Sequence, residues 1–155
     1  MHRIRVALVA AAMTLTAGTL LTGPAQAAPD DVRGPNCDAL WRAHQNDGNV
    51  WAYRDLDCHV ELGHTPGNDF NWADGSGALT GSDNDAATSL LNTGQAGVSS
   101  VQFYEHAGPA GGTGCVSRGE LYVDNLTDNV FNNGVGANDT ISAHRWSSGC
   151  VNPWT

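Results

Sequence analysis

The stretch Asn84-Asp85-Ala86-Ala87-Thr88-Ser89 recurs further along the chain as Asn138-Asp139-Thr140-Ile141-Ser142-Ala143. A second match precedes it, since Val50-Trp51-Ala52-Tyr53-Arg54 lines up with Val101-Gln102-Phe103-Tyr104-Glu105. The offset is 51 residues at the aromatic match and 54 at the Asn-Asp match, so the units differ by a three-residue insertion. The chain therefore contains an internal repeat, in which each unit opens with an aromatic strand and closes with an Asn-Asp-x-x-hydroxyl stretch.

Short apolar runs are separated by Gly, Asn and Asp at intervals of about ten residues, which is typical of all-β domains. We expect strands at residues 50–53, 98–104, 120–123 and 141–146. No segment keeps a sustained helical period, although residues 38–44 could form a short helix or an irregular turn. Two units of four strands each would pack face to face, because neither could bury its apolar face alone. The sequence predicts an all-β sandwich.

The first 27 residues have the three parts of a secretory signal peptide. Arg3 and Arg5 precede an apolar stretch at residues 6–21, and the small residues Ala25 and Ala27 then mark a cleavage site. The apolar stretch is too short and too rich in Thr and Gly for a membrane anchor, and no later segment could span a bilayer. We expect a secreted, extracellular protein of 128 residues, cleaved after Ala27.

The mature length suits one domain with short extensions at both ends. We expect an N-terminal extension at residues 28–48, a domain at residues 49–146 and a C-terminal tail at residues 147–155. Within the domain, the repeat places motif one at residues 49–97 and motif two at residues 98–146. Trp154, in the polar tail, is the residue for which the sequence offers the least explanation.

The mature chain would be strongly acidic. Cleavage leaves five arginines, no lysine and sixteen acidic residues, a formal charge of −11. Such a chain is repelled by phosphate backbones and by anionic lipids, so we expect neither a nucleic-acid partner nor a membrane partner. The charge favours solubility and the binding of cations, and we expect a monomer.

All four cysteines, Cys37, Cys58, Cys115 and Cys150, lie in the mature part. An even number in an exported chain predicts two disulfides, for which three pairings are possible. We favour Cys37–Cys58 with Cys115–Cys150, because each bond would attach a flanking extension to the domain. A zinc site is the alternative, and the absence of any Cys-x-x-Cys pair speaks against it.

The repeated Asn-Asp-x-x-hydroxyl stretch has the chemistry of a calcium ligand. Ca²⁺ takes six to eight oxygens at about 2.3–2.6 Å, and the stretch offers an amide, a carboxylate, a carbonyl and a hydroxyl. The same residue types also cluster in ordinary turns, where their side chains bond to the nearby backbone. Two copies at matching places in a repeat favour the metal, and a second segment is needed to complete each shell.

The two stretches resemble the [Asn/Asp]-[Asn/Asp]-x-x-[Ser/Thr]-Ser signature of the microbial βγ-crystallins. The first copy matches at every defined position, whereas the second ends in Ala143. The likeness covers roughly residues 49–146 and extends to the secreted actinobacterial peptidase inhibitors of the Streptomyces metalloproteinase inhibitor group. It implies two calcium-binding Greek-key motifs that form a βγ-crystallin-type sandwich, stapled here by the two disulfides.

The resemblance also implies two crossed calcium sites. Each would combine a carbonyl and a hydroxyl of one stretch with the aspartate of the other stretch and a carbonyl from an aromatic strand. The first site would use the Ala86 carbonyl, the Thr88 hydroxyl, the Asp139 carboxylate and the Arg54 carbonyl. The second site would use the Thr140 carbonyl, the Ser142 hydroxyl, the Asp85 carboxylate and the Glu105 carbonyl. Waters would complete both shells, and the ions would tie the two motifs together.

A folded hairpin is the third element of the likeness. Tyr104-Glu105 is followed by Gly108 and Gly111, and Gly111 would take the strained turn of the family's hairpin. The first unit has Val60 at the corresponding place, so we expect Gly63 to provide a displaced turn there.

Other patterns point to no active site, and we expect a protein that is not an enzyme. Residues 59–64 contain two histidines and a glutamate without the His-Glu-x-x-His order of zinc peptidases. On a strand, His59 and Glu61 would share one face and His64 would lie on the other. Trp51, Trp72 and Trp146 are interpreted as core or rim residues rather than as sugar-binding platforms.

Three functions remain open. The first is a secreted calcium-binding protein whose metal stabilises the fold, which calcium binding without any effect on proteases would favour. The second is an inhibitor of an extracellular metallopeptidase, acting through the segments at residues 108–115 or 147–150. The third is a small antimicrobial or killer-toxin-like protein, which growth inhibition of yeast or rival bacteria would reveal.

Overall fold

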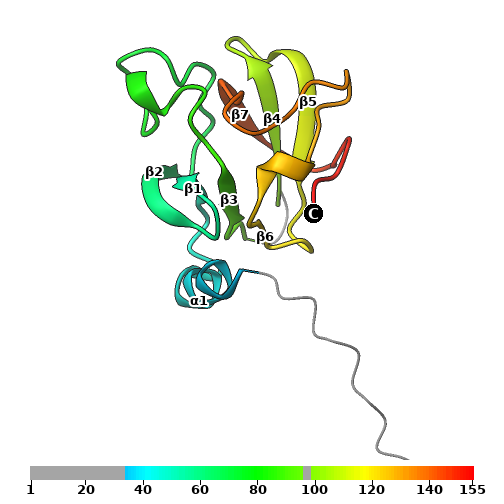
Figure 1. Cartoon of the computed structure of the whole chain (residues 1–155). Helices are drawn as coiled ribbons and strands as arrows, with labels where there is room; N and C mark the ends of the chain where they lie inside the picture. Colours follow the sequence, from blue (N-terminus) through cyan, green and yellow to red (C-terminus); the bar gives the residue numbers. More distant parts are fainter. Residues whose placement is uncertain (1–33, 96–98) are drawn as a thin grey trace, which may run out of the picture. The chain divides into compact units, whose positions relative to one another are not determined.

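The computed structural model of the chain describes residues 34–95 and 99–155. The predicted signal peptide, residues 1–27, lies outside the described residues. The elements in chain order are α1 (Pro35–His44), β1 (Val50–Asp55), β2 (His59–Thr65), η1 (Gly81–Asp83), β3 (Ser89–Asn92), β4 (Ser100–His106), β5 (Ala110–Val116), β6 (Tyr122–Val123), η2 (Leu126–Asp128) and β7 (Ala143–Ser147) (Figure 1). Among the described residues, no helix has the length and apolar character needed to cross a membrane.

The strands form two antiparallel sheets that exchange strands between the repeat units. One sheet has the order β2-β1-β3-β6 and the other has the order β5-β4-β7. β6 belongs to the second unit but pairs with β3 of the first, with Leu90 opposite Val123. In return, Asp69 of the first unit forms an antiparallel bridge to His144 in β7. This exchange confirms the predicted all-β sandwich of two Greek-key motifs.

The two units differ in their third strand. We expected four strands in each, and the second unit has them as β4, β5, β6 and β7. In the first unit the corresponding segment is reduced to the single bridge at Asp69. The strand expected at residues 120–123 is also shorter, because Leu121 has a left-handed backbone with a φ of 71° and interrupts it.

The main core lies between the sheets and draws on both repeat units. Its largest fully buried side chains include Trp72, Phe103, Phe131 and Leu90. The apolar run at the start of β1 divides by alternation, with Val50 and Ala52 in this core and Trp51 and Tyr53 on the other face of the sheet.

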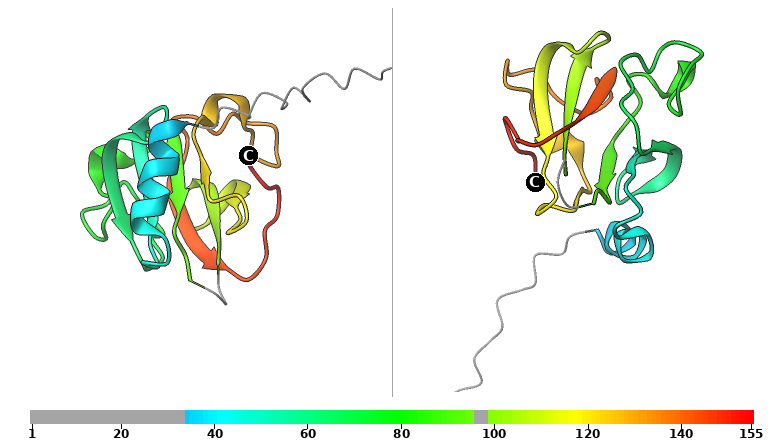
Figure 2. Two further views of the ribbon diagram at one scale, coloured as in Figure 1. Left: turned by 90° about the horizontal axis from the view of Figure 1, so that it is seen from below. Right: turned by 180° about the vertical axis from the view of Figure 1, so that it is seen from behind.

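The outer face of the first sheet is covered by α1, which explains why β1 and β3 are apolar on both faces. Trp51, Tyr53 and Leu91 form a second cluster there, with Leu40 and Trp41 of the helix packed against it. The left view of Figure 2 shows α1 lying beside this sheet. The helix confirms one of the two alternatives expected for residues 38–44.

The amino end of α1 is held by a carboxylate from the following hairpin. Asp57 Oδ1 accepts hydrogen bonds from the backbone N–H groups of Asn36 and Cys37, at 3.0 and 2.9 Å. These groups have no partner within a helix, and a negative charge near them also complements the helix dipole. Pro35 occupies the first turn of α1, where its missing N–H costs no hydrogen bond. The Asp57 carboxylate anchors the helix to the hairpin from its first residues.

Both favoured disulfides are confirmed. Cys37 bonds to Cys58 and Cys115 to Cys150, with Cα–Cα distances of 5.0 and 5.5 Å. The first attaches α1 to the β1–β2 hairpin and the second attaches the C-terminal segment to β5. All four cysteines are oxidised, so they form no zinc site, and two disulfides are typical of a protein that folds in an oxidising compartment.

The C-terminal segment returns into the core. Trp154 is 2% exposed and stacks on Phe103, with ring centroids 5.8 Å apart. Its indole Nε1 donates to the Val130 carbonyl at 2.8 Å, so the polar end of the ring is also satisfied. The residue left unexplained by the sequence is therefore a core residue, delivered to its place by the neighbouring Cys150 disulfide.

A buried histidine is locked in one tautomer. His144 is fully buried, and its Nδ1 lies 3.0 Å from the indole Nε1 of Trp72. Because an indole nitrogen can only donate, Nδ1 must accept, and the proton therefore sits on Nε2, which donates to the Gly67 carbonyl. Protonation of Nδ1 would break the bond to Trp72 and bury a charge, and burial lowers the pKa of His144 to about 4.

This histidine predicts a loss of stability in mild acid. With an unfolded pKa near 6.5 and a folded pKa of about 4, the unfolded chain binds more protons between these values. The contribution of His144 to the free energy of unfolding is complete above pH 6.5 and falls by up to about 3 kcal/mol as the pH drops to 4. Urea unfolding at several pH values gives the free energy of unfolding as a function of pH. Between pH 6.5 and 4, this free energy should fall less steeply for His144→Gln than for the wild type. An equal pH dependence of the free energy of unfolding in the two proteins would mean that His144 does not titrate on unfolding.

Candidate metal centre

The two Asn-Asp stretches lie side by side and match each other atom for atom. Asp85 donates its backbone N–H to the Ile141 carbonyl at 3.1 Å, and Asp139 donates to the Ala87 carbonyl at 3.0 Å. Both aspartates adopt a left-handed backbone, with φ of 54° and 52°, which Asp tolerates better than most residues. The repeat seen in the sequence is therefore a repeat in space, related by an approximate two-fold axis.

The side chains cross between the units. The Ser142 hydroxyl donates to Asp85 Oδ1 at 3.1 Å, and the Thr88 hydroxyl donates to Asp139 Oδ1 at 3.4 Å. These are the two aspartate–hydroxyl pairs that the resemblance assigns to the same ions. Residues separated by more than fifty positions are thus brought together from opposite motifs, with both aspartates exposed to solvent.

The aromatic strands bring the remaining predicted residues to the same place. Thr88 N–H donates to the Tyr53 carbonyl at 2.9 Å, and Ser142 N–H donates to the Tyr104 carbonyl at 3.0 Å. Arg54 and Glu105 directly follow these tyrosines, so their backbones lie next to the hydroxyl residues. The structure therefore gathers segments from all four predicted stretches at one edge of the sandwich.

The side chain of Glu105 has a task of its own. Its Oε2 accepts hydrogen bonds from the Gly112 N–H at 2.8 Å and from the Asn133 amide at 2.7 Å. These bonds, the one to the Gly112 backbone first, hold the pKa of the Glu105 carboxyl below its usual range. Only the backbone carbonyl of Glu105 belongs to the predicted ligand set, so the two roles do not compete.

Several oxygens around the crossed pairs have no hydrogen-bond partner. The side-chain oxygens of Asn84 and Asn138 are buried and unpaired, while their amide nitrogens donate to Asp85 and Asp139 at 2.7 and 2.8 Å. The third-position carbonyls, which belong to Ala86 and Thr140, accept no hydrogen bond from any described residue. Unpaired carbonyl and amide oxygens beside two exposed carboxylates suit a hard cation such as Ca²⁺.

The two asparagines were left out of the ligand sets inferred from the sequence. The pattern itself offers their amide oxygens, but the family's arrangement assigns ligands only from the second position of the signature onward. Within residues 34–95 and 99–155, no three His, Cys, Asp or Glu side chains converge on one point. Each predicted site contains a single carboxylate, so its remaining ligands are oxygens of neutral groups.

The hairpin of the second unit matches its prediction. Gly111 has a φ of 76°, and a Cβ added there would approach Glu105 and His106 to within 2.9 Å. In the first unit the prediction for Gly63 is wrong. Val60 takes the left-handed turn with a φ of 57°, whereas Gly63 lies in β2, where a Cβ would come within 2.4 Å of the Ala78 carbonyl.

The alternation expected for residues 59–64 is also wrong. His64 Nδ1 lies 2.7 Å from Glu61 Oε1, although the two were placed on opposite faces. The cause is a β-bulge, since Gly63 pairs with Ala52 whereas Glu61 pairs with the next residue, Tyr53. The extra residue, Leu62, resets the alternation of the strand.

One of the two segments proposed for protease inhibition is not a free loop. Residues 110–116 form β5, which pairs with β4 along its length. Residues 148–150 follow β7 and lead to the Cys150 disulfide.

Comparisons with known proteins give similarities in structure and none in sequence. No family model matches the chain, and no curated protein is similar to it. A structure described as "Evolution of the eye lens beta-gamma-crystallin domain fold" is 19% identical, with a TM-score of 0.47, over 63% of this chain and 83% of that one. A βγ-crystallin from Ciona intestinalis is 14% identical, with a TM-score of 0.44, over 64% of this chain and 100% of its own.

A βγ-crystallin from an archaeon is 15% identical, with a TM-score of 0.44, over 63% of this chain and 95% of that chain. The all-β fold class follows from the strand order of the two sheets and from the exchange of strands between the repeat units.

Proposed function

We propose that the protein is a secreted, non-enzymatic calcium-binding protein in which Ca²⁺ stabilises the paired Greek-key motifs. The observation that supports this most is the crossed pairing of Asp85 with Ser142 and of Asp139 with Thr88. A turn would explain hydrogen bonds within one stretch, but it gives no reason for a carboxylate of one motif to face the hydroxyl of the other.

The proposed ligands lie close to one another in the structure. Each hydroxyl holds the carboxylate from the other motif, and the third-position carbonyls of Ala86 and Thr140 lie in the same short stretches. When bound, Ca²⁺ would supply a positive charge that pairs with these negatively polarised oxygens. The cost of ordering the ligands would be small, because the hydrogen bonds described above fix their backbones.

Binding at these positions would act on the whole domain. The ligands of each site come from both motifs, so unfolding either motif would release both ions. A ligand that binds only the folded state raises the free energy of unfolding by about 2.7 kcal/mol at a hundred times its dissociation constant. The predicted export to the extracellular medium and the two disulfides fit a protein that meets free calcium and an oxidising environment.

Thermal unfolding tests the proposal. We expect millimolar Ca²⁺ to raise the melting temperature by several degrees relative to the protein in chelator. Mg²⁺ should have a smaller effect, because it demands near-ideal octahedral geometry and gives up its waters reluctantly. Identical melting curves in calcium and in chelator would contradict the proposal.

A further inference from the structure

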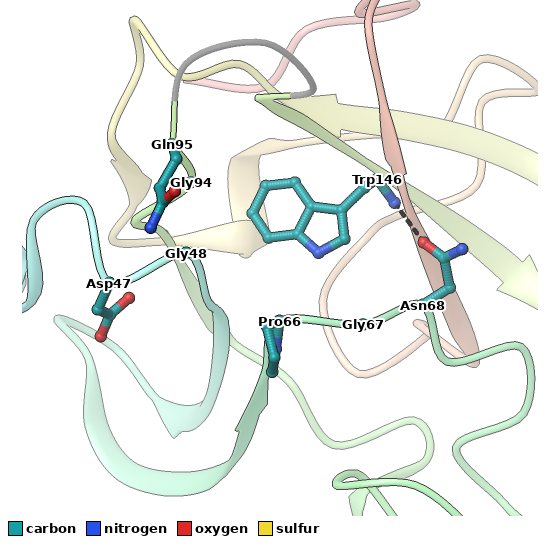
Figure 3. A pocket seen from close by; sticks show the side chains of 8 residues that line it. All are labelled: Asp47, Gly48, Pro66, Gly67, Asn68, Gly94, Gln95 and Trp146. Carbon is teal, nitrogen blue, oxygen red and sulfur yellow. Dashed lines mark hydrogen bonds between the residues drawn. The ribbon is translucent and has the colours of Figure 1, made fainter.

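A hollow lies at the end of the sandwich opposite to the candidate metal centre. The metal centre is found where β1 ends and where β3 and β7 begin, whereas the hollow is found where β1 begins and where β3 and β7 end. It measures about 490 Å³, a volume typical of small-molecule sites. Its lining comprises Asp47, Gly48, Pro66, Gly67, Asn68, Gly94, Gln95 and Trp146 (Figure 3).

Trp146 lies at the centre of this hollow and is held firmly in place. Its backbone N–H donates to the Asn68 side-chain oxygen at 2.8 Å. The edge of its ring packs against Gly94, where an added Cβ would come within 2.6 Å of the ring. Figure 3 shows the ring between Gln95 and Pro66, with its nitrogen turned toward Pro66. The backbone of Trp146 is therefore fixed, and one edge of its ring is packed against the chain.

The indole nitrogen of Trp146 is buried and has no hydrogen-bond partner among the described residues. A buried donor without an acceptor costs about 1–3 kcal/mol, so such groups are normally satisfied by protein, water or ligand. The indole nitrogens of Trp72 and Trp154, by contrast, both donate to an acceptor within the chain. This nitrogen is turned toward Pro66 in the wall of the hollow, so a ligand can pair with it only if the ring shifts toward the hollow.

The polar groups around the ring favour a neutral ligand. The one carboxylate in the lining, Asp47, already accepts from the Thr93 hydroxyl and the Asn49 N–H, and its other oxygen lies 3.3 Å from His44. None of the eight lining residues is basic. Gln95 donates its amide nitrogen to the Asn46 carbonyl at 3.1 Å, which leaves its side-chain oxygen for a ligand. An anion finds no counter-charge among these residues, and a cation finds only the Asp47 carboxylate, whose two oxygens already have partners.

We propose that this hollow binds a neutral saccharide. A sugar ring has an apolar C–H face that can stack on the indole and a rim of hydroxyls that can both donate and accept. One hydroxyl would donate to the Gln95 side-chain oxygen, and a slight shift of the ring would let another accept from the Trp146 nitrogen. Gly67, where an added Cβ would meet only the Thr65 hydroxyl at 3.5 Å, leaves room for the ligand to approach the backbone closely. The site is separate from the calcium ligands and does not depend on them.

The test is a titration of the nitrogen-15-labelled protein with cellohexaose, chitohexaose and xylohexaose, followed by NMR. The chain has five tryptophans, and the indole signal of Trp146 is identified by its absence in Trp146→Phe. We expect at least one oligosaccharide to shift this signal together with the backbone signals of Gly67 and Gly94. Heparin hexasaccharide and lysine peptides, which are charged, should leave these signals unmoved.

The variants separate binding from folding. Trp146→Ala should weaken the binding about tenfold or more, as expected for a central aromatic contact. The matched control is Trp41→Phe, because Trp41 lies on α1 outside the hollow and its nitrogen bonds to the Asn92 carbonyl. If Trp146→Ala fails to fold, the signals that the oligosaccharides shift in the wild-type protein still locate the binding site. The proposal is overturned if none of the three oligosaccharides moves the Trp146 signal at millimolar concentration, or if only a charged probe does.

Discussion

Replacing Trp154 by alanine is expected to lower the free energy of unfolding by about 3–5 kcal/mol, which is a large part of the stability of a domain this size. The side chain is 2% exposed, stacks on Phe103 and meets Phe131 edge to face, with ring centroids 5.2 Å apart in the second pair. Its loss would open a cavity in the main core and remove one of the two donors to the Val130 carbonyl, the other being the Asn152 amide. Urea unfolding with both disulfides intact measures the effect.

The same contact can be tested from its other side. Gly114 lies beneath the Trp154 ring, and a Cβ added there would come within 1.9 Å of the ring atoms. Gly114→Ala should therefore force the tail out of the core and destabilise the protein by a comparable amount. Gly149→Ala is the matched control, since a Cβ there would meet no atom within 4 Å. A change below 1 kcal/mol for Trp154→Ala would show that the tail is not part of the core.

The second large effect concerns the aspartates of the candidate metal centre. In Asp85→Asn and Asp139→Asn, we expect the calcium-dependent stabilisation to fall by about 2.7 kcal/mol at a hundred times the dissociation constant of the lost site. Asparagine keeps the size of the side chain, tolerates the left-handed backbone and can still accept from Ser142 or Thr88. Stability in chelator should therefore change little, and the loss should appear only when calcium is present.

Asp128→Asn is the control for these variants. Asp128 is also exposed and also accepts from the amide of a neighbouring asparagine, Asn129, at 2.9 Å. It forms no bond with a hydroxyl of the other motif, so its replacement should leave the calcium effect intact. The crossed arrangement would be wrong if Asp128→Asn reduced the calcium effect as much as Asp85→Asn does, measured by the difference in melting temperature with calcium and with chelator.

The features that could be predicted from the sequence are those encoded by repetition. The paired aromatic strands and the paired Asn-Asp stretches fixed the two-fold organisation, because a duplicated unit that cannot bury its own apolar face must pack on its copy. The resemblance to the βγ-crystallin signature implied that Asp85 lies near Ser142 and Asp139 near Thr88, and the structure brings both pairs within hydrogen-bond distance. The disulfide pairing followed from the positions of the cysteines at the two ends of the domain.

The features that could not be predicted depend on single residues that break the repeat. The extra residue Leu62 shifts β2 by one position and reverses the alternation after it, and no composition signal marks such a bulge. Val60 holds a left-handed turn that normally calls for glycine, so the search for a glycine pointed to the wrong residue.

The role of Trp154 was hidden by its polar surroundings. The only signal near it was Cys150, four residues earlier, which ties the tail to β5. Asn152 completes the approach, since its amide nitrogen donates to the Thr113 and Val130 carbonyls at 3.1 and 2.8 Å. A polar tail can thus carry a core residue when its own polar groups are satisfied by the backbone that it crosses.

The two motifs are linked in this account by cations that each bind residues of both halves. Calorimetric titration of the purified protein with CaCl₂ tests this idea most directly. We predict two calcium ions per chain for the wild type and one for each of Asp85→Asn and Asp139→Asn. A titration without binding heat at any temperature, or two ions still bound by both variants, would contradict it.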